Sequence, residues 1–178
     1  MELRTPRCDV RSYRSDDAAS LASHANNRKI WLNLRDRFPH PFHEHDGAAY
    51  IADVLARPHP TSFAIVVDGS AVGGISLRVG SDIERFSAEL GYWLGEPFWG
   101  RGIVSDAVAA ITEFAFRDLA LARIFAVPFA HNTASHRVLE KAGYQCEGIL
   151  RASAVKDGRL LDEHLYARVN PDFAAPAS

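Results

Sequence analysis

A glycine-rich turn is the segment of this sequence best suited to bind a ligand. The residues Trp99-Gly100-Arg101-Gly102 follow the pattern of a strand and precede the pattern of a long helix. Glycines let the backbone approach a ligand closely, and the free N–H groups of a first helical turn favour negative charge. The pattern therefore predicts a cradle for phosphate or pyrophosphate. A tight turn without a ligand is the alternative interpretation.

Two common phosphate-binding motifs do not describe this turn. No Gly-Lys-Ser/Thr follows it, so it is not a Walker loop. Ser105 and Asp106 occupy the positions where the third glycine of a dinucleotide fingerprint could fall. The turn alone therefore predicts neither kind of nucleotide site, and a turn without a ligand stays open.

A second segment, from His131 to Tyr144, also carries polar groups at helix-forming spacing. Asn132 is expected to cap the start of a helix, and Gly143 to end it. Arg137 and Lys141 lie one helical turn apart, where they could reach phosphates or simply be solvated.

Composition and charge restrict the class of protein. The chain has 178 residues, 20 Lys and Arg against 22 Asp and Glu, and 47% hydrophobic residues. These values are typical of one soluble globular domain, expected over residues 1–170 with a flexible tail over 171–178. The near-neutral charge argues against a nucleic-acid partner. No apolar run approaches the ~20 residues that cross a bilayer, so no membrane partner is expected.

The N-terminal segment and the cysteines predict the compartment. Residues 1–7 lack the apolar run of a secretory signal. Cys8 and Cys146 match no metal or redox spacing, and both lie in apolar runs, so we expect buried, reduced thiols. The sequence therefore predicts a cytoplasmic protein.

The elements that position these motifs follow from the apolar periodicity. The predicted class is α/β, a mixed sheet of about seven strands with helices on its faces. Strands are expected over 8–14, 62–67, 71–79, 86–94, 123–129, 144–155 and 160–169, and helices over 15–25, 28–38, 43–56, 100–119 and 133–142.

Together, the glycine turn and the segment Asn132-Thr133-Ala134-Ser135-His136-Arg137-Val138-Leu139-Glu140-Lys141-Ala142-Gly143-Tyr144 resemble the GNAT superfamily of acyl-CoA N-acyltransferases. The nearest likeness is to its ribosomal-protein N-terminal alanine acetyltransferases, the RimJ/RimL-like branch. The resemblance spans residues 10–169 and implies the GNAT fold, with a mostly antiparallel, splayed sheet. It also implies acetyl-CoA as co-substrate, no metal, and direct acetyl transfer to a primary amine.

The resemblance assigns the donor site. It implies that backbone N–H groups from Trp99 to Val104 bind the pyrophosphate of CoA, with Arg101 adding a phosphate contact or remaining solvated. Pro97 replaces the leading Gln or Arg of the family pattern. The end of the strand that precedes the turn should splay from its neighbour, leaving backbone groups of Trp93 and Leu94 for the pantetheine arm. Asn132 should bind the same arm, and Arg137 and Lys141 the phosphates. The implied pyrophosphate set is Trp99, Gly100, Arg101, Gly102, Ile103 and Val104.

Catalysis by this chain would depart from the common family pattern. Leu139 stands where many members have a proton-donating tyrosine, and Ala154 where the branch can have a glutamate. The resemblance leaves Ser135 as the group that could protonate the departing thiolate. Glu89 could accept a proton from the amine, or it could orient the amine or pair with an arginine.

The helical pair that precedes the sheet should wall the acceptor site. Arg35 and Asp36 could clamp a peptide or small amine, and Phe38 and Phe42 could shape an apolar pocket. Trp31 belongs to the same wall, and the alternative is that most of these aromatic residues lie in the core. His40, His43 and His45 invite a metal interpretation, but His43 and His45 should face different directions in a helix or a strand, and no supporting ligand accompanies them.

The acceptor itself stays open at this point. A peptide or protein α-amine is preferred, and a small amine such as an antibiotic or polyamine is the main alternative. Succinyl-CoA could replace acetyl-CoA as the donor. A CoA-binding sensor without catalysis is the alternative outside the enzymes. The chain is expected to be a monomer or a homodimer.

Overall fold

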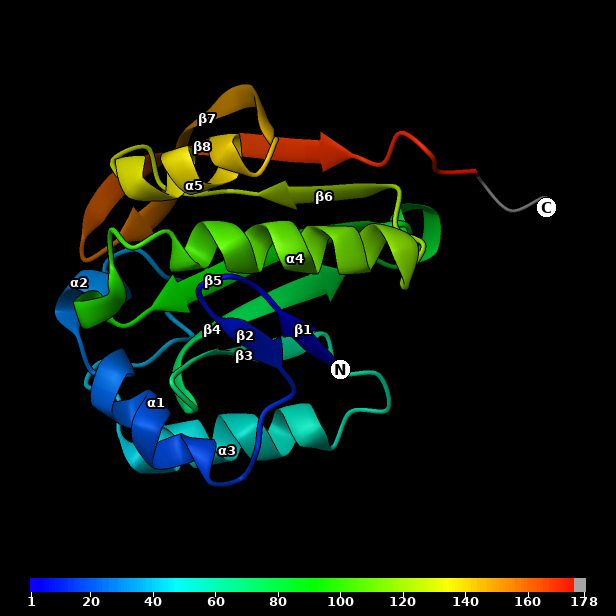
Figure 1. Ribbon diagram of the computed structural model, residues 1–178. Helices are drawn as coiled ribbons and strands as arrows, with labels where there is room; N and C mark the ends of the chain where they lie inside the picture. Colours follow the sequence, from blue (N-terminus) through cyan, green and yellow to red (C-terminus); the bar gives the residue numbers. More distant parts are fainter. Residues whose placement is uncertain (175–178) are drawn as a thin grey trace.

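An open sheet of eight strands runs through the molecule in the order β1-β2-β3-β4-β5-β6-β8-β7 (Figure 1). The structure is a computed structural model that describes residues 1–174. All neighbouring strands are antiparallel except β5 and β6, which are parallel. The strands are β1 (Glu2–Arg4), β2 (Asp9–Arg11), β3 (Ser62–Val67), β4 (Ser70–Val79), β5 (Ser87–Leu94), β6 (Arg123–Ala126), β7 (Gln145–Lys156) and β8 (Arg159–Val169).

The strand missed by the sequence interpretation is β1. It has only three residues, which pair with β2, and so few residues cannot show a period-2 pattern. The predicted order of the other elements is confirmed, with small differences at their ends. The fold is the predicted mixed, mostly antiparallel sheet with helices on its faces.

Five α-helices are described: α1 (Asp17–Ala25), α2 (Arg28–Trp31), α3 (Glu44–Leu55), α4 (Ile103–Arg117) and α5 (Thr133–Lys141). Two single 3₁₀ turns, η1 (Asp82–Glu84) and η2 (Glu96–Phe98), flank β5. The helix predicted over 28–38 is wrong after Trp31. Residues 33–38 turn instead, with Arg35 bound to Glu89 and Asp36 bound to Lys156. Tertiary contacts of this kind commonly override local helix propensity.

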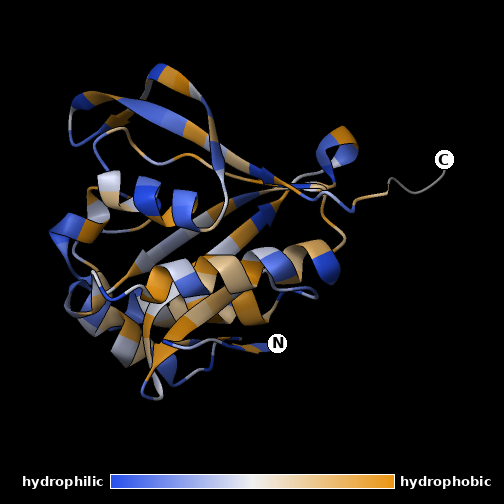
Figure 2. Ribbon diagram, turned by 45° about the horizontal axis from the view of Figure 1, so that its top comes forward, coloured by the Kyte–Doolittle hydropathy of each residue, from blue (hydrophilic) through white to orange (hydrophobic). Residues whose placement is uncertain are grey.

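Both faces of the sheet are covered. In β3, the side chains of Phe63, Ile65 and Val67 pack in the cluster that includes the buried stripe of α4. The alternate residues Ala64 and Val66 pack with α1 and α3 on the other face. This alternation follows from the period of a strand, and it makes β3 buried along its whole length. Figure 2 shows that most residues of α4 are apolar, and the buried ones belong to the cluster that packs against the sheet.

The sheet opens between its two parallel strands. β5 pairs with β6 only over Ser87–Glu89, opposite Arg123–Phe125, although β5 continues to Leu94 in contact with β4. The predicted splay at this place is confirmed. The opening lies directly before the glycine turn and beside the start of α5 (Figure 1).

The structure changes the prediction for one of the two cysteines and describes only part of the predicted tail. Cys8 is buried as expected, but Cys146 is exposed, because β7 is an edge strand with most of its residues in solvent. The predicted tail begins with a turn, and the Phe173 ring lies 5.2 Å from that of Phe86. Residues 175–178 of that tail lie outside the described part. None of the described helices combines the length and the apolar character needed to span a bilayer.

Candidate active site

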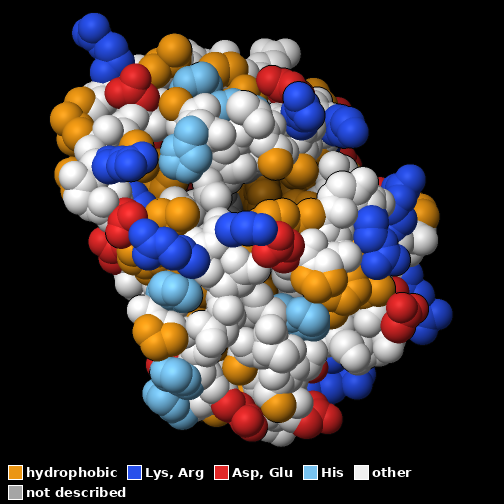
Figure 3. Space-filling view, turned by 90° about the vertical axis from the view of Figure 1, so that its left-hand side faces the viewer, with side chains coloured by type: hydrophobic (Ala, Val, Ile, Leu, Met, Phe, Trp, Pro, Cys, Tyr) orange, Lys and Arg blue, Asp and Glu red, His pale blue; other side chains and the backbone are white. Residues whose placement is uncertain are grey.

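A cleft of about 1810 Å³ extends from the opening between β5 and β6 toward α3. The face shown in Figure 3 has a hollow near its centre. Apolar side chains lie deep in this hollow, and charged side chains lie at its rim. Arg101, Trp31 and Asp36 are the predicted site residues that do not line the cleft. The predicted residues that do line it are Arg35, Phe38, Glu89, Trp93, Leu94, Trp99, Gly100, Gly102, Ile103, Val104, Asn132, Ser135, Arg137 and Lys141.

The glycine turn has the backbone geometry that the sequence predicts. Gly100 and Gly102 have φ values of 73° and 79°, in the left-handed region that disfavours other residues. Gly102 is the N-cap of α4, so the unpaired N–H groups of the first turn follow it directly. A Cβ at Gly102 would lie 3.3 Å from the Nε atom of Arg7.

Arg7 beside this turn was missed by the sequence interpretation. Its Nη1 atom donates to both carboxylate oxygens of Asp106, at 2.9 and 3.0 Å. No sequence pattern links the N-terminal segment to α4, so only the fold reveals this contact. The pair fixes a cation next to the predicted pyrophosphate site. Arg137 and Lys141 add two exposed cations along the cleft, and neither forms an ion pair with a described carboxylate.

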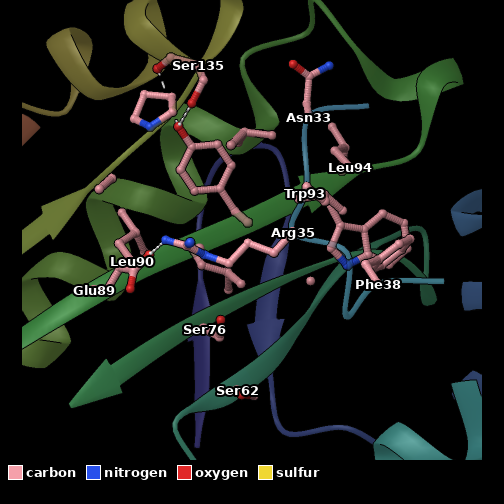
Figure 4. A pocket seen from close by; sticks show the side chains of 18 of the residues that line it. Asn33, Arg35, Phe38, Ser62, Ser76, Glu89, Leu90, Trp93, Leu94 and Ser135 are labelled. Carbon is pink, nitrogen blue, oxygen red and sulfur yellow. Dashed lines mark hydrogen bonds and ion pairs between the residues drawn. The ribbon is translucent and has the colours of Figure 1, made fainter. Parts of the chain in front are cut away.

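The strand end beside the opening differs in detail from the prediction. The Gly95 N–H donates to the Val72 carbonyl of the β4 side, and backbone groups alternate along a strand. The backbone of Trp93 therefore faces β4, while that of Leu94 faces the opening. The Leu94 carbonyl already accepts a hydrogen bond from Trp99 Nε1 at 2.7 Å. The side chain of Trp93 is among those that line the cleft (Figure 4).

The start of α5 holds a hydroxyl pair. Asn132 caps the helix, its Oδ1 accepting from the Ser135 N–H at 3.1 Å. The Ser135 Oγ lies 2.6 Å from the hydroxyl of Tyr92 on β5, as the dashed line at Ser135 shows (Figure 4). Burial raises the pKa of Tyr92 well above its usual range, although the hydrogen bond to Ser135 opposes this. Tyr92 therefore stays protonated and fixes the position of the Ser135 hydroxyl.

Tyr92 was not singled out from the sequence. The signal that could have found it is its place in β5, three residues beyond the last pair with β6 and on the alternate face from Glu89. A polar-tipped aromatic residue at that position must point at the α5 side of the opening.

Glu89 is held by two arginines on the other face of β5. Its Oε1 accepts from Arg35 Nη2 at 2.5 Å (Figure 4). Its Oε2 accepts from Arg78. Burial alone would raise the pKa of Glu89, but the hydrogen bonds and charges of the two arginines outweigh it and lower the pKa below the ordinary 4.5. A carboxylate in this state is a weak proton acceptor. The geometry favours the pairing role over the base role.

A second carboxylate of the cleft was missed. Glu163 of β8 is 8% exposed, lines the cleft and accepts a hydrogen bond from Ser153 Oγ at 2.8 Å. The sequence signal, a glutamate in the apolar half of a strand, is weak because strands often carry isolated acidic residues on a solvent face.

Trp31 and Asp36 fasten the β7–β8 hairpin instead of lining the cleft. The Nζ atom of Lys156 lies 2.7 Å from Asp36 Oδ1 and 3.7 Å from the centre of the Trp31 ring. A second ion pair of 2.6 Å joins Arg28 to Asp157 at the hairpin turn. These contacts hold the hairpin tip against α2 and the turns that follow it. The same turns carry Arg35 into the cleft.

Among the described residues, His40, His43 and His45 do not come together as a group that could hold a metal ion. His40 stacks on Trp31, with ring centres 5.7 Å apart. His43 and His45 stack on each other at 5.4 Å, so the prediction that they face different directions is wrong. The reason is that His43 is the extended N-cap of α3 and not part of the helix.

Comparisons with known proteins agree with this geometry. The family model described as an acetyltransferase (GNAT) domain matches residues 7–145. The uS5-alanine N-acetyltransferase of Escherichia coli is 28% identical, covering 97% of this chain and 93% of its own. An uncharacterized N-acetyltransferase, p20, of Bacillus licheniformis is also 28% identical, over 97% and 98%.

Solved structures extend the likeness to the whole fold. RimJ of Mycobacterium smegmatis in complex with a CoA disulfide superimposes with a TM-score of 0.83 and 26% identity, covering 95% of this chain and 86% of that one. The family match spans more than half of the chain and includes the glycine turn, β5 and α5. This chain belongs to the GNAT family of N-acetyltransferases.

Proposed function

We propose that this chain takes the acetyl group from acetyl-CoA and transfers it to the α-amine of a peptide or protein. The observation that carries the proposal is the opening between β5 and β6. It places the glycine turn, the hydroxyl of Ser135 and two carboxylates along one cleft. The ribosomal-protein relatives support a protein N-terminus as the acceptor.

The donor would lie along the opening with its pyrophosphate on the turn. Backbone N–H groups from Trp99 to Val104 would bind the phosphate oxygens, aided by the dipole of α4. Arg7, Arg137 and Lys141 would add positive charge around the anion. The pantetheine arm would pass between the backbone of Leu94 and the amide of Asn132, which retains its Nδ2 donor for the ligand while Oδ1 caps α5.

The chemistry needs a neutral amine and a proton for the departing thiolate. A peptide α-amine has a pKa of ~7.7–8.0, so a sizeable fraction is neutral near pH 7. Ser135 would give a proton to the sulfur as the C–S bond breaks, and Tyr92 would hold the serine hydroxyl in place. In this proposal Glu89 positions Arg35 and Arg78 and does not accept the amine proton.

The acceptor end has room for a second substrate. The cleft exceeds the ~300–1,000 Å³ typical of a site for one small ligand. Phe38 stacks on Phe42 and contacts Trp93, with ring centres 4.9 and 5.6 Å apart, giving this end an apolar wall. A ribosomal-protein acceptor would also imply a cytoplasmic location.

The test is release of CoA thiol from the purified protein with acetyl-CoA or succinyl-CoA and a mixed set of acceptors. The set contains peptides with free and blocked N-termini, lysine side chains, polyamines and aminoglycosides. Release that needs a free peptide N-terminus supports the proposal. Release with a small amine alone identifies the other acceptor class. Calorimetric binding of CoA without any release identifies a sensor and refutes transfer.

A further inference from the structure

Glu163 is a buried carboxylate without a cationic partner. Only 8% of the residue is exposed, and no ion pair joins it to a described Lys, Arg or His nitrogen. Ser153 Oγ donates to its Oε2, while Oε1 makes no hydrogen bond to a described residue. Burying a charge without a partner costs free energy. Among the described residues no fully buried side-chain oxygen lacks a partner, so Oε1 is reached from the cleft, where an entering cation could pair with it.

The backbone around Glu163 is shaped for this arrangement. Pairing between β7 and β8 is irregular between Leu150 and Ala154. Within this bulge Ala152 has a φ of 53°, a conformation that disfavours residues with a Cβ, and its N–H donates to Asp162 at 2.7 Å. The bulge is what places the Ser153 hydroxyl on Glu163. Bulges of this kind are over-represented beside active sites, where they redirect a side chain.

The side chain of Glu163 points to the acceptor face of the sheet. Its neighbour His164 stacks on His136 of α5, with ring centres 4.7 Å apart, so Glu163 faces away from α5. On β5 the same holds for Glu89, because Tyr92 contacts α5 and Glu89 lies on the alternate face. β5 and β8 flank β6, and both glutamates line the cleft. An acceptor entering from this face would therefore meet two carboxylates, one on each side.

The two carboxylates are not equivalent. Both oxygens of Glu89 already accept from arginines, whereas Glu163 has one oxygen open to the cleft. An ammonium group is the cation that an N-acetyltransferase receives as substrate. Its charge and N–H donors match a carboxylate oxygen.

We propose that the acceptor ammonium binds Glu163 and gives its first proton to that carboxylate, an inference that rests on the proposed function. The neutral nitrogen then bonds to the thioester carbonyl carbon, and the C–S bond breaks. The second proton leaves the nitrogen and reaches the thiolate through Ser135. Glu163 returns its proton to water. An ammonium and a thioester thus give an amide, a thiol and one proton.

Glu163→Gln tests the charge separately from the shape. Glutamine keeps an oxygen for the Ser153 hydroxyl and removes only the negative charge. With acetyl-CoA and an alanine-initiated peptide, we expect kcat/KM to fall ~100-fold or more, in the range of general-base losses, with a higher KM for the peptide. The Kd for CoA, measured by calorimetry, should stay unchanged.

Two further variants separate a catalytic from a structural role. Glu163→Ala should lose activity to the same extent but also lower the urea midpoint, because it removes the bond to Ser153, whereas Glu163→Gln should leave the midpoint equal or higher. Glu147→Gln is the matched control, an exposed glutamate on β7 paired with Arg123, and should keep wild-type kcat/KM. Retention of kcat/KM within ~3-fold in Glu163→Gln, or parallel losses of stability and CoA affinity, would overturn the inference.

The inference can fail separately from the proposed acceptor. If the wild-type protein acetylates no peptide, the acceptor class is wrong, and binding decides the role of Glu163. Butylammonium chloride should then raise the melting temperature of the wild-type complex with CoA and leave that of Glu163→Gln unchanged. Equal shifts in both proteins, or no shift in the wild type, would overturn the inference.

Discussion

The two ends of the cleft are built from different kinds of group. At the proposed donor end, the groups offered to a ligand are mostly backbone N–H groups that follow Gly102 at the start of α4. At the proposed acceptor end they are side chains brought from distant segments, with Arg35 and Arg78 on Glu89 and with Glu163 beside the β7 bulge. A backbone site tolerates most substitutions except at its glycines, whereas a side-chain site can change with a single residue.

This difference bears on how one fold accepts different amines. The donor is common to the family, so the turn that binds it can be fixed by backbone geometry. The acceptor varies between relatives, and loops and hairpins that vary independently of the sheet are where such variation is tolerated. In this chain the Lys156–Asp36 pair and the Trp31 ring join the turns after α2 to the β7–β8 hairpin.

Apart from the Glu163 variants, the largest effect on activity is expected at the boundary between the two ends of the cleft. Ser135→Ala should lower kcat ~100-fold by removing the proton donor for the thiolate, and Tyr92→Phe should lower it ~10-fold by releasing the serine hydroxyl. Neither should change the Kd for CoA more than ~3-fold, because the pyrophosphate contacts are elsewhere. Single-turnover kinetics and calorimetry measure both quantities. Full kcat in Ser135→Ala would remove Ser135 from the mechanism.

At the donor end, Gly102→Ala should raise the Kd for CoA ~10-fold. A Cβ at this φ costs ~1–2 kcal/mol, and it would press on Arg7 at 3.3 Å. The KM for the acceptor should not change. Gly69→Ala is the control, because Gly69 has a similar φ of 81° but no atom near its Cβ position. If both variants bind CoA equally, the turn does not hold the pyrophosphate.

At the acceptor end, Lys156→Met should raise the acceptor KM ~5-fold and leave the Kd for CoA unchanged. The substitution removes the ion pair with Asp36 and the cation from the Trp31 ring, together worth ~1 kcal/mol. Steady-state kinetics at saturating acetyl-CoA gives the acceptor KM. An unchanged KM combined with weaker CoA binding would mean that the hairpin serves the donor.

The smallest effect is expected on the free energy of unfolding, in which substitutions of Glu89 and Glu163 should differ. The pKa of Glu89 is lowered in the folded protein, so its arginine pairs contribute stability above the unfolded pKa, and this contribution is lost as pH falls through the folded pKa. Glu89→Gln should thus be less stable at pH 7, by about 1 kcal/mol or less, with the difference becoming smaller as the pH is lowered below about 4. Urea unfolding at both pH values measures this.

Glu163→Gln provides the comparison for this measurement. Because Glu163 lacks a cation, its neutral variant should not lose stability at pH 7. Equal destabilisation of the two variants at pH 7 would mean that the carboxylates have the same role, and it would contradict the proposal that only Glu163 is free to bind the acceptor.

The glycine turn and the start of α5 could be predicted from the sequence, because neighbouring residues determine both features. Gly100 and Gly102 need left-handed backbone, and a capped helix follows Asn132. The strand at 62–67 was predicted to the residue, since a mostly apolar run that ends in Ile65-Val66-Val67, after Pro60 and before Asp68-Gly69, leaves little choice.

The acceptor end could not be predicted in the same detail, because it is formed by contacts between residues that lie far apart in the sequence. Arg35 meets Glu89 and Lys156 meets Asp36 across long stretches of chain, and these contacts end the helix that local periodicity would continue past Trp31. The β7 bulge has no glycine to mark it, since Ala152 adopts the positive φ. Glu163 therefore became visible only in three dimensions.

The assignment of the donor and acceptor ends is tested most directly by calorimetry, with CoA titrated separately into the wild type, Gly102→Ala and Glu163→Gln. The account predicts that Gly102→Ala loses about 10-fold in affinity and that Glu163→Gln binds as the wild type does. If Glu163→Gln loses affinity while Gly102→Ala keeps it, the donor and acceptor ends have been assigned to the wrong parts of the cleft.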